Sequence, residues 1–223
     1  MRNEHPVCFV SLSQSFGHYN VVATKWGSPL TLYKEKGILS FIDILSMTRE
    51  CLGDDTKNHS FLLGVSANPK GSMKELIDLI KQKYDKLKEC TSKTPVIIID
   101  NLSLWIDIGY SINQVIHFVN VLNRLVLKPS QPDLEAGSFI SNLDSGLTHD
   151  DIDKTVLWKY MSHMSDMTIE VSGLDSGFCK EVHGKIKVSW KDSLLKITSR
   201  IMQFRVMDKS IALFASGMSS AVI

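Results

Sequence analysis

The chain is poor in the residues that interrupt or cross-link a polypeptide, since its 223 residues include 13 glycines, 6 prolines and 4 cysteines. So little glycine and proline excludes collagen-like and low-complexity classes. The cysteines lie far apart and form no C-x-x-C pair, which leaves zinc-ribbon and thioredoxin-type sites without support. We expect buried, reduced thiols of an intracellular protein at Cys8, Cys51, Cys90 and Cys179.

Long apolar runs and an excess of one charge sign are also missing. No stretch reaches the roughly 18 uninterrupted apolar residues of a membrane span, and residues 1–6 lack the apolar core of a signal peptide. Lys and Arg total 25 against 24 Asp and Glu, so the formal net charge is +1. We expect a soluble protein with no membrane partner, in which any contact with nucleic acid requires a local basic patch.

Apolar residues make up 43 % of the sequence, which is enough to build a sizeable core. Short apolar runs typical of strands buried on both faces lie at 7–12, 38–43 and 95–100, and a further strand is indicated at 138–143. Amphipathic helical patterns lie at 19–26, 73–87, 112–126 and 156–164. Capping boxes precede two of them, at Ser72 with Glu75 and at Ser111 with Gln114.

The C-terminal third has a different pattern. Strand-like segments lie at 167–171, 184–190, 201–207 and 210–214, and the turn-like pair Asp208-Lys209 indicates a β-hairpin between the last two. We predict one domain over residues 1–223 with an α/β fold. Its mostly parallel sheet is flanked by helices and ends in an antiparallel edge.

An apolar strand that ends in a carboxylate, as 95–100 ends in Asp100, is the Walker B pattern, in which the carboxylate helps to hold Mg²⁺ beside nucleotide phosphates. The simpler alternative is that the next turn needs a side-chain acceptor. The phosphate loop G-x-x-x-x-G-K-[ST] that would decide between them is absent from the sequence. Gly184-Lys185 is followed by isoleucine, and Cys179 occupies the position of the first glycine. We therefore expect no autonomous ATP hydrolysis.

No other catalytic, metal or cofactor site is predicted. A G-x-S-x-G motif is missing, and Cys179 and His183 are close in sequence, which a catalytic pair does not require. The acidic stretch from His149 to Asp153 lacks the glycine and the terminal glutamate of a calcium loop, so a hydrated loop is expected.

The segment 172–185 is a better candidate for a binding loop. It joins two predicted strands, contains three glycines and presents one aromatic and several cationic side chains. Such a loop can stack a base and contact phosphates, whereas the alternative is an ordinary hairpin connection with scattered polar residues. The candidate contacts are Phe178, Lys180, His183 and Lys185.

Four separated blocks of the sequence resemble subunit six of the Elongator complex. They run in order from Val7 to near the C-terminus: VCFV and QSF-x-HYN within 7–20, PVIIIDNLS at 95–103, GFCK-x-VHG at 177–184 and FA-x-GMS-x-AV at 214–222. The resemblance implies a RecA-like fold without a working Walker A motif. It also implies a hetero-hexameric ring with two copies each of subunits four, five and six.

In that family the ring is an accessory module of Elongator that binds tRNA, with an affinity linked to ATP, while another subunit modifies the wobble uridine, U34. The resemblance therefore implies a non-catalytic subunit without a cofactor, in the cytoplasm and also in the nucleus. Within this hypothesis the loop 178–185 contacts tRNA, and Asp100 is related to a lost nucleotide site. Two rivals stay open: a nucleotide hydrolase that uses Asp100, and an assembly scaffold without tRNA contact.

The family carries a strand and a helix ahead of the block at Val7, corresponding to the first strand and the degenerate phosphate-loop region, and this sequence begins without them. Loss of a strand leaves the backbone groups of its neighbours unpaired. We expect this form to be less stable than one that includes the segment, or to depend on its partners.

Overall fold

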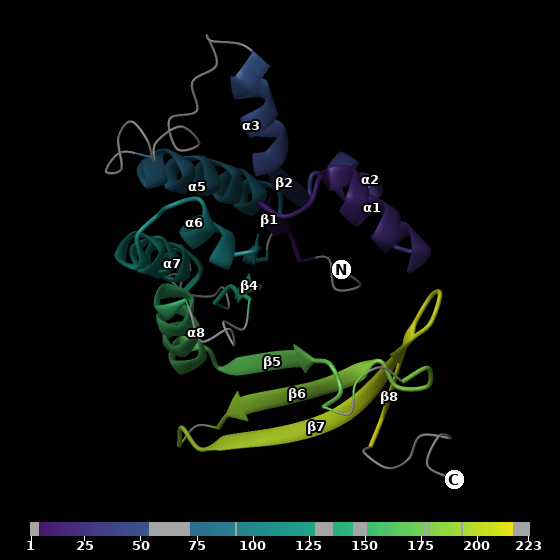
Figure 1. Cartoon of the computed structure of the whole chain (residues 1–223). Coiled ribbons are helices and arrows are strands. Elements are labelled where there is room, and N and C mark those ends of the chain that lie inside the picture. The colour runs from purple at the N-terminus through teal and green to yellow at the C-terminus, as the bar shows by residue number, and fades with distance from the viewer. Residues whose placement is uncertain are drawn as a thin grey trace. The chain divides into compact units, whose positions relative to one another are not determined.

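The structure is a computed structural model that describes residues 5–53, 72–91, 93–127, 136–144, 151–175, 177, 179–192 and 194–215. The chain divides into two compact units, Met1–Leu157 and Trp158–Ile223, and each contains a sheet of its own (Figure 1). This division does not test the prediction of a single domain, because one domain can contain two compact units.

The first unit is built on a parallel sheet with the strand order β2-β1-β3-β4. Its strands are β1 (Val7–Ser11), β2 (Leu39–Asp43), β3 (Val96–Asp100) and β4 (Phe139–Ser141). The register sets Val7 opposite both Leu39 and Val96, so the carboxyl ends of the strands meet at one edge. The strands predicted from apolar runs are confirmed.

Helices cover both faces of this sheet. The helices in the described residues are α1 (Phe16–Lys25), α2 (Leu30–Glu35), α3 (Ile44–Gly53), α5 (Ser72–Cys90), α6 (Ser103–Asp107), α7 (Ile112–Leu127) and α8 (Ile152–Met164). Helices α1 and α2 pack on one face. There the ring centroid of Phe9 lies 4.8 Å from that of Tyr19 and 5.1 Å from that of Phe41. Helices α5 and α7 pack on the other (Figure 1), against side chains such as Val10 and Ile97 that are wholly buried.

The predicted apolar stripe of α5 is buried throughout, from Met73 to Leu87. The capping box of α7 is present as well: the amide of Ser111 donates to Oε1 of Gln114 at 2.9 Å, and the amide of Gln114 donates to Oγ of Ser111 at 3.4 Å. Helices α2 and α6 were not predicted, because with 6 and 5 residues they are too short to show a helical period. Helix α3 was also missed, because it leads into a charged stretch of the sequence without a clear pattern.

The second unit is an antiparallel sheet in which neighbours along the chain pair in the order β5-β6-β7-β8. Its strands are β5 (Met167–Ser172), β6 (Gly184–Lys191), β7 (Ile197–Val206) and β8 (Ile211–Phe214). The predicted fold class is confirmed, but these strands form a separate sheet and do not extend the edge of the parallel one. Hairpin connections account for this, since each strand finds its partner in the next strand along the chain.

The prediction of buried cysteines is right for Cys8 and wrong for Cys90, which is exposed at the end of α5; Cys179 is half-buried. Burial raises the pKa of the Cys8 thiol to about 12, so this thiol stays protonated and inert. Cys51 lies where side chains are outside the described part of the chain. None of the described helices is both long and apolar enough to cross a membrane.

Candidate functional site

The carboxyl edge of the parallel sheet brings polar side chains together around Asp100, the last residue of β3. Its Oδ2 accepts hydrogen bonds from the hydroxyls of Ser13 and Tyr19. Its Oδ1 accepts a bond from Nδ2 of Asn142 at 2.9 Å. One carboxylate therefore links the loop after β1, helix α1 and the segment after β4.

The network continues on either side of this carboxylate. Nδ2 of Asn101 donates to Oδ1 of Asp144 at 2.8 Å, and the amide of Ser103 donates to Oδ1 of Asn101 at 3.0 Å. At the end of β2, Oδ2 of Asp43 accepts the amide of Phe16 at 3.1 Å and so caps the start of α1. The acidic side chains at this edge thus serve the chain's own donors.

The electrostatics of Asp100 follow from these bonds. Burial raises the pKa of its carboxyl, but the bonds from Ser13, Tyr19 and Asn142 outweigh burial, and the net pKa lies below the ordinary aspartate value. For Tyr19, burial raises the pKa of the hydroxyl, and the bond to Asp100 raises it further. At neutral pH the site is an ionised carboxylate held by neutral donors.

This arrangement favours the turn-acceptor interpretation of Asp100. Hydrogen bonds from Ser13, Tyr19 and Asn142 occupy three of the roughly four acceptor positions of this carboxylate, so little of its capacity is left for Mg²⁺. In the part of the chain that the structure describes, no group of three or more His, Cys, Asp or Glu residues could hold a metal ion. The relation of Asp100 to a nucleotide stays a prediction.

The candidate binding loop separates into residues with different surroundings. Phe178 lies outside the described residues. Lys180 is exposed, and among the residues described no carboxylate pairs with it. Lys185, at the second position of β6, pairs with the carboxylate of Asp175. Of the two lysines, Lys180 has the charge that is available to a phosphate.

The last part of this loop, residues 182–184, makes contacts within the second unit. Val182 is buried, and Nδ1 of His183 accepts the backbone amide of Val206 at 3.1 Å. A Cβ at Gly184 would lie 2.7 Å from Cε1 of Phe204, so only glycine lets that ring lie across the strand. These contacts connect the start of β6 to β7, and they neither require nor exclude contact with a ligand.

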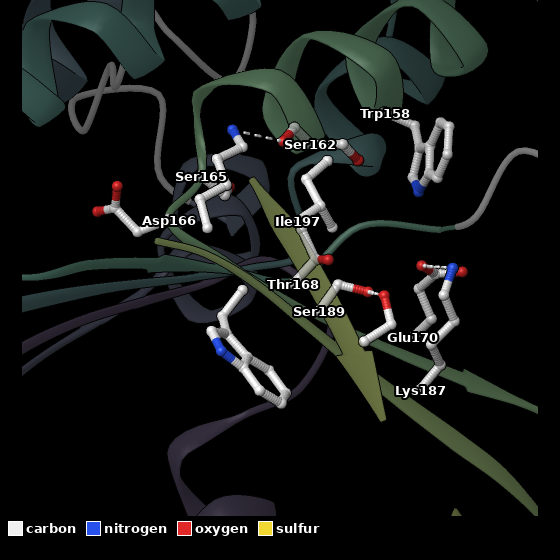
Figure 2. Close-up of a pocket in the computed structure, with 12 residues that line it drawn as sticks. Trp158, Ser162, Ser165, Asp166, Thr168, Glu170, Lys187, Ser189 and Ile197 are labelled. Atoms are coloured by element: carbon white, nitrogen blue, oxygen red, sulfur yellow. Dashed lines mark hydrogen bonds and ion pairs between the residues drawn. The ribbon is translucent and has the colours of Figure 1, made fainter. Parts of the chain in front are cut away.

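A small cavity in the second unit was not predicted from the sequence (Figure 2). It measures about 180 Å³ and lies between the C-terminal half of α8, at Trp158 and Ser162, and one face of the antiparallel sheet. Its polar side chains bond to one another: Oγ of Ser189 lies 2.9 Å from that of Ser199, and Lys187 pairs with Glu170. Because these residues lie on different elements, no local pattern could have revealed the cavity.

One known protein family matches almost the whole length of the chain. The family model described as Elongation complex protein 6 matches residues 1–208 of the chain. The chain belongs to this family.

Members of the Elongation complex protein 6 family from several vertebrates align along almost the whole chain. Elongator complex protein 6 of Rattus norvegicus is 31 % identical over 226 residues, and that of Homo sapiens is 29 % identical over 223 residues. Each alignment covers 97 % of this chain and 82 % of the relative.

Solved structures agree on the fold of this family member. A KaiC-like protein of Pyrococcus horikoshii superimposes with a TM-score of 0.57 at 10 % identity, covering 96 % of this chain and 78 % of the other. An uncharacterised protein of the same organism, crystallised with an unknown peptide, gives a TM-score of 0.53 at 9 % identity. The fold is therefore RecA-like, as the resemblance implied, and likeness at such low identity carries no further information about activity.

Proposed function

We propose that this chain is a non-catalytic RecA-like subunit of the accessory ring of Elongator, assembled with subunits four and five. In this role it supports tRNA binding by the ring and the modification of the wobble uridine that another subunit performs. Membership of the Elongation complex protein 6 family supports the assembly, and the RecA-like fold supports the ring.

The observation that carries the non-catalytic part of the proposal is the engagement of Asp100. Asp100, the carboxylate singled out by the Walker B pattern, accepts hydrogen bonds from Ser13, Tyr19 and Asn142, which supports a role in holding three segments together. A hydrolase needs a carboxylate that faces the metal and the phosphates. The absence of the phosphate-loop motif from the sequence points in the same direction.

The tRNA contact proposed for this chain is centred on Lys180. Its ammonium group is exposed and has no carboxylate partner among the described residues, whereas Lys185 is neutralised by Asp175. Free cations contribute to binding of a phosphate backbone through the release of counterions. Phe178, as a stacking group, and His183 and Lys185, as weaker phosphate contacts, complete the proposed set.

The test is co-expression of this chain with Elongator subunits four and five, followed by measurement of stoichiometry, ATP hydrolysis and tRNA binding. We expect a fixed ratio of the three chains, no ATP turnover by this chain alone, and tRNA that crosslinks to it within the ring. ATP turnover by the isolated chain that is lost in Asp100→Asn and kept in Asp43→Asn would overturn the proposal in favour of a hydrolase. Crosslinking of tRNA only to the other subunits would reduce the role to assembly.

A further inference from the structure

The two faces of the antiparallel sheet differ in chemistry. Residues that pair directly across antiparallel strands project from the same face, so the register assigns every side chain to a face. One face collects most of the large apolar side chains and is called the apolar face below. Its apolar members are Met167, Ile169, Val171, Ile186, Val188, Trp190, Met202, Phe204, Val206, Ile211 and Leu213.

Much of this apolar face is open to solvent. The fractional exposure is 63 % at Val171, 58 % at Ile169 and 51 % at Leu213. Most of the exposed members lie on the edge strand β5 and, beside the other end of β7, on β8, whereas Ile186, Val188, Met202 and Phe204 between them are half-buried. Isolated exposed apolar residues are ordinary, but a contiguous exposed set on one face marks an interaction site.

The opposite face carries most of the polar side chains, together with the exposed Ile197 and Ile201, and α8 covers part of it. Glu170 pairs with Lys187 there, and Ser189 bonds to Ser199. The side chains of this face line the cavity beneath Trp158 (Figure 2). An antiparallel sheet with one free face normally buries its apolar side and leaves its polar side in water. In this sheet α8 lies over part of the polar side, so the apolar face is left for a cover other than α8.

The size of the apolar face suits a protein partner. Strand β5 lies beside the part of β6 that pairs with residues 198–203 of β7, whereas β8 pairs with residues 203–206, so about three strands lie side by side along most of the face. With strands about 4.8 Å apart and about 3.3 Å per residue, the face measures roughly 10 by 26 Å, on the order of 250 Å². This is about a third of the roughly 800 Å² that each partner contributes to a standard protein interface, so the face would form the apolar part of a larger contact. A polar rim around it would complete such an interface.

We propose that the apolar face is the docking surface for a different protein chain, whose contact surface is apolar and places a carboxylate opposite Arg200. This inference deepens the proposed function and rests on it for the source of that chain, namely another subunit of the assembly. Arg200 is the one charged residue whose register position lies on this face, beside Val188. It is exposed, and no described carboxylate forms an ion pair with it.

The charge of Arg200 indicates which kind of molecule can cover the apolar face. A second copy of the chain would bring another Arg200, and the face contains no acidic residue to pair with either of them. Burying two such cations without counter-charges is unfavourable. A nucleic acid would need several cations where this face has one. A different chain with an apolar surface and one carboxylate satisfies both the apolar side chains and the guanidinium.

The experiment compares matched substitutions in the chain co-expressed with Elongator subunits four and five. Val171→Lys lies on the apolar face, and its control Ser172→Lys is the next residue, exposed on the opposite face. We expect assembly to weaken by at least about tenfold for Val171→Lys and to stay unchanged for Ser172→Lys, because a buried, unpaired ammonium opposes docking. Equal thermal melts of the two isolated variants would show that both are folded.

Two further measurements identify the occupant. Arg200→Glu should weaken assembly, whereas Lys196→Glu, in the β6–β7 turn, should not. A photo-crosslinking benzoylphenylalanine at Ile169 should capture subunit four or five. Capture of a second copy, or of the first unit of the same chain, would overturn the inference.

The outcomes separate the inference from the proposed function. If the unmodified chain assembles and Val171→Lys assembles equally well, the inference is wrong and the proposed function stands. If the unmodified chain does not co-purify with subunits four and five, both are wrong. If the face is buried in a ring that does not bind tRNA, the inference stands and the tRNA part of the proposed function is wrong.

Discussion

The two sheets of this chain handle their apolar side chains in opposite ways. The parallel sheet is covered on both faces by helices of its own unit, and Ile97 and Ile99 of β3 are wholly buried. The antiparallel sheet leaves Ile169 and Val171 of β5 in solvent and turns polar pairs toward α8. The difference indicates two roles: the first unit supplies the stable core of the chain, and the second presents an apolar surface to another protein.

The strongest test of this difference is to truncate an isoleucine to alanine in each sheet. Ile97→Ala should cost about 2–5 kcal/mol of unfolding free energy, because it opens a cavity in a closed core. Ile169→Ala, on the exposed face, should change it by less than about 0.5 kcal/mol. Urea unfolding followed by circular dichroism measures both. Equal costs would mean that the face of β5 is already packed within the chain.

The second unit does contain one tightly packed point, at Gly184. A Cβ there would lie 2.4 Å from the carbonyl oxygen of Ser172 and 2.7 Å from Cε1 of Phe204. Gly184→Ala should therefore destabilise the antiparallel sheet by about 1–3 kcal/mol. Gly173→Ala is the control, since a Cβ at that position would meet nothing within 4 Å. Hydrogen exchange at β6 and β7 would report the change, and equal exchange in both variants would contradict the packing argument.

In the parallel unit, the hydrogen bonds to Asp100 predict a dependence of stability on pH. Because its pKa is lowered in the folded state, the stabilisation is present above the unfolded value of about 3.9 and is lost as the pH falls through the folded value. Tyr19→Phe removes one donor and should cost about 1 kcal/mol at pH 7. The loss of stability between pH 7 and pH 3 should also become smaller.

The control for that prediction is Tyr33→Phe, in the same aromatic cluster. In the described residues no hydrogen bond of its hydroxyl is present, so its acid response should match that of the unmodified protein. An identical acid response in Tyr19→Phe would mean that the bond to Asp100 contributes nothing to the titration.

The smallest expected effect concerns the two lysines of the proposed tRNA contact. Lys180→Gln should weaken tRNA binding by the assembled ring and lower the slope of log K against log salt by about one. Lys185→Gln should do less, because Asp175 already neutralises that charge. Filter binding at several salt concentrations would separate them. A larger effect at Lys185 would mean that the ion pair opens when tRNA binds.

Much of the parallel unit could be predicted from the sequence, because its elements carry strong local patterns. A run such as 96–99 has few alternatives to a buried strand, and the capping box at Ser111 sets the start of α7. The pairing of the last four strands was less accessible. Strand-like segments at 184–190 and 201–207 predict strands, but nothing local says whether they join an existing sheet or form their own.

The candidate site shows a similar division. Asp100 could be singled out because a carboxylate after a buried strand is a recognisable pattern, yet its donors, Ser13, Tyr19 and Asn142, come from distant parts of the sequence. The apolar face escaped prediction for another reason. Alternation in β5 predicts one apolar face and gives no information about whether a cover belongs to the same chain.

An uncovered apolar face also has a consequence for the number of copies that a cell can keep. A surplus chain would show Met167, Ile169 and Val171 along an edge strand, which is the kind of segment that chaperones and proteases recognise. The side chains that bind another subunit would therefore also lead to degradation of a chain that has not been assembled. Abundance of this chain would then follow the supply of its companions, with no separate regulator needed.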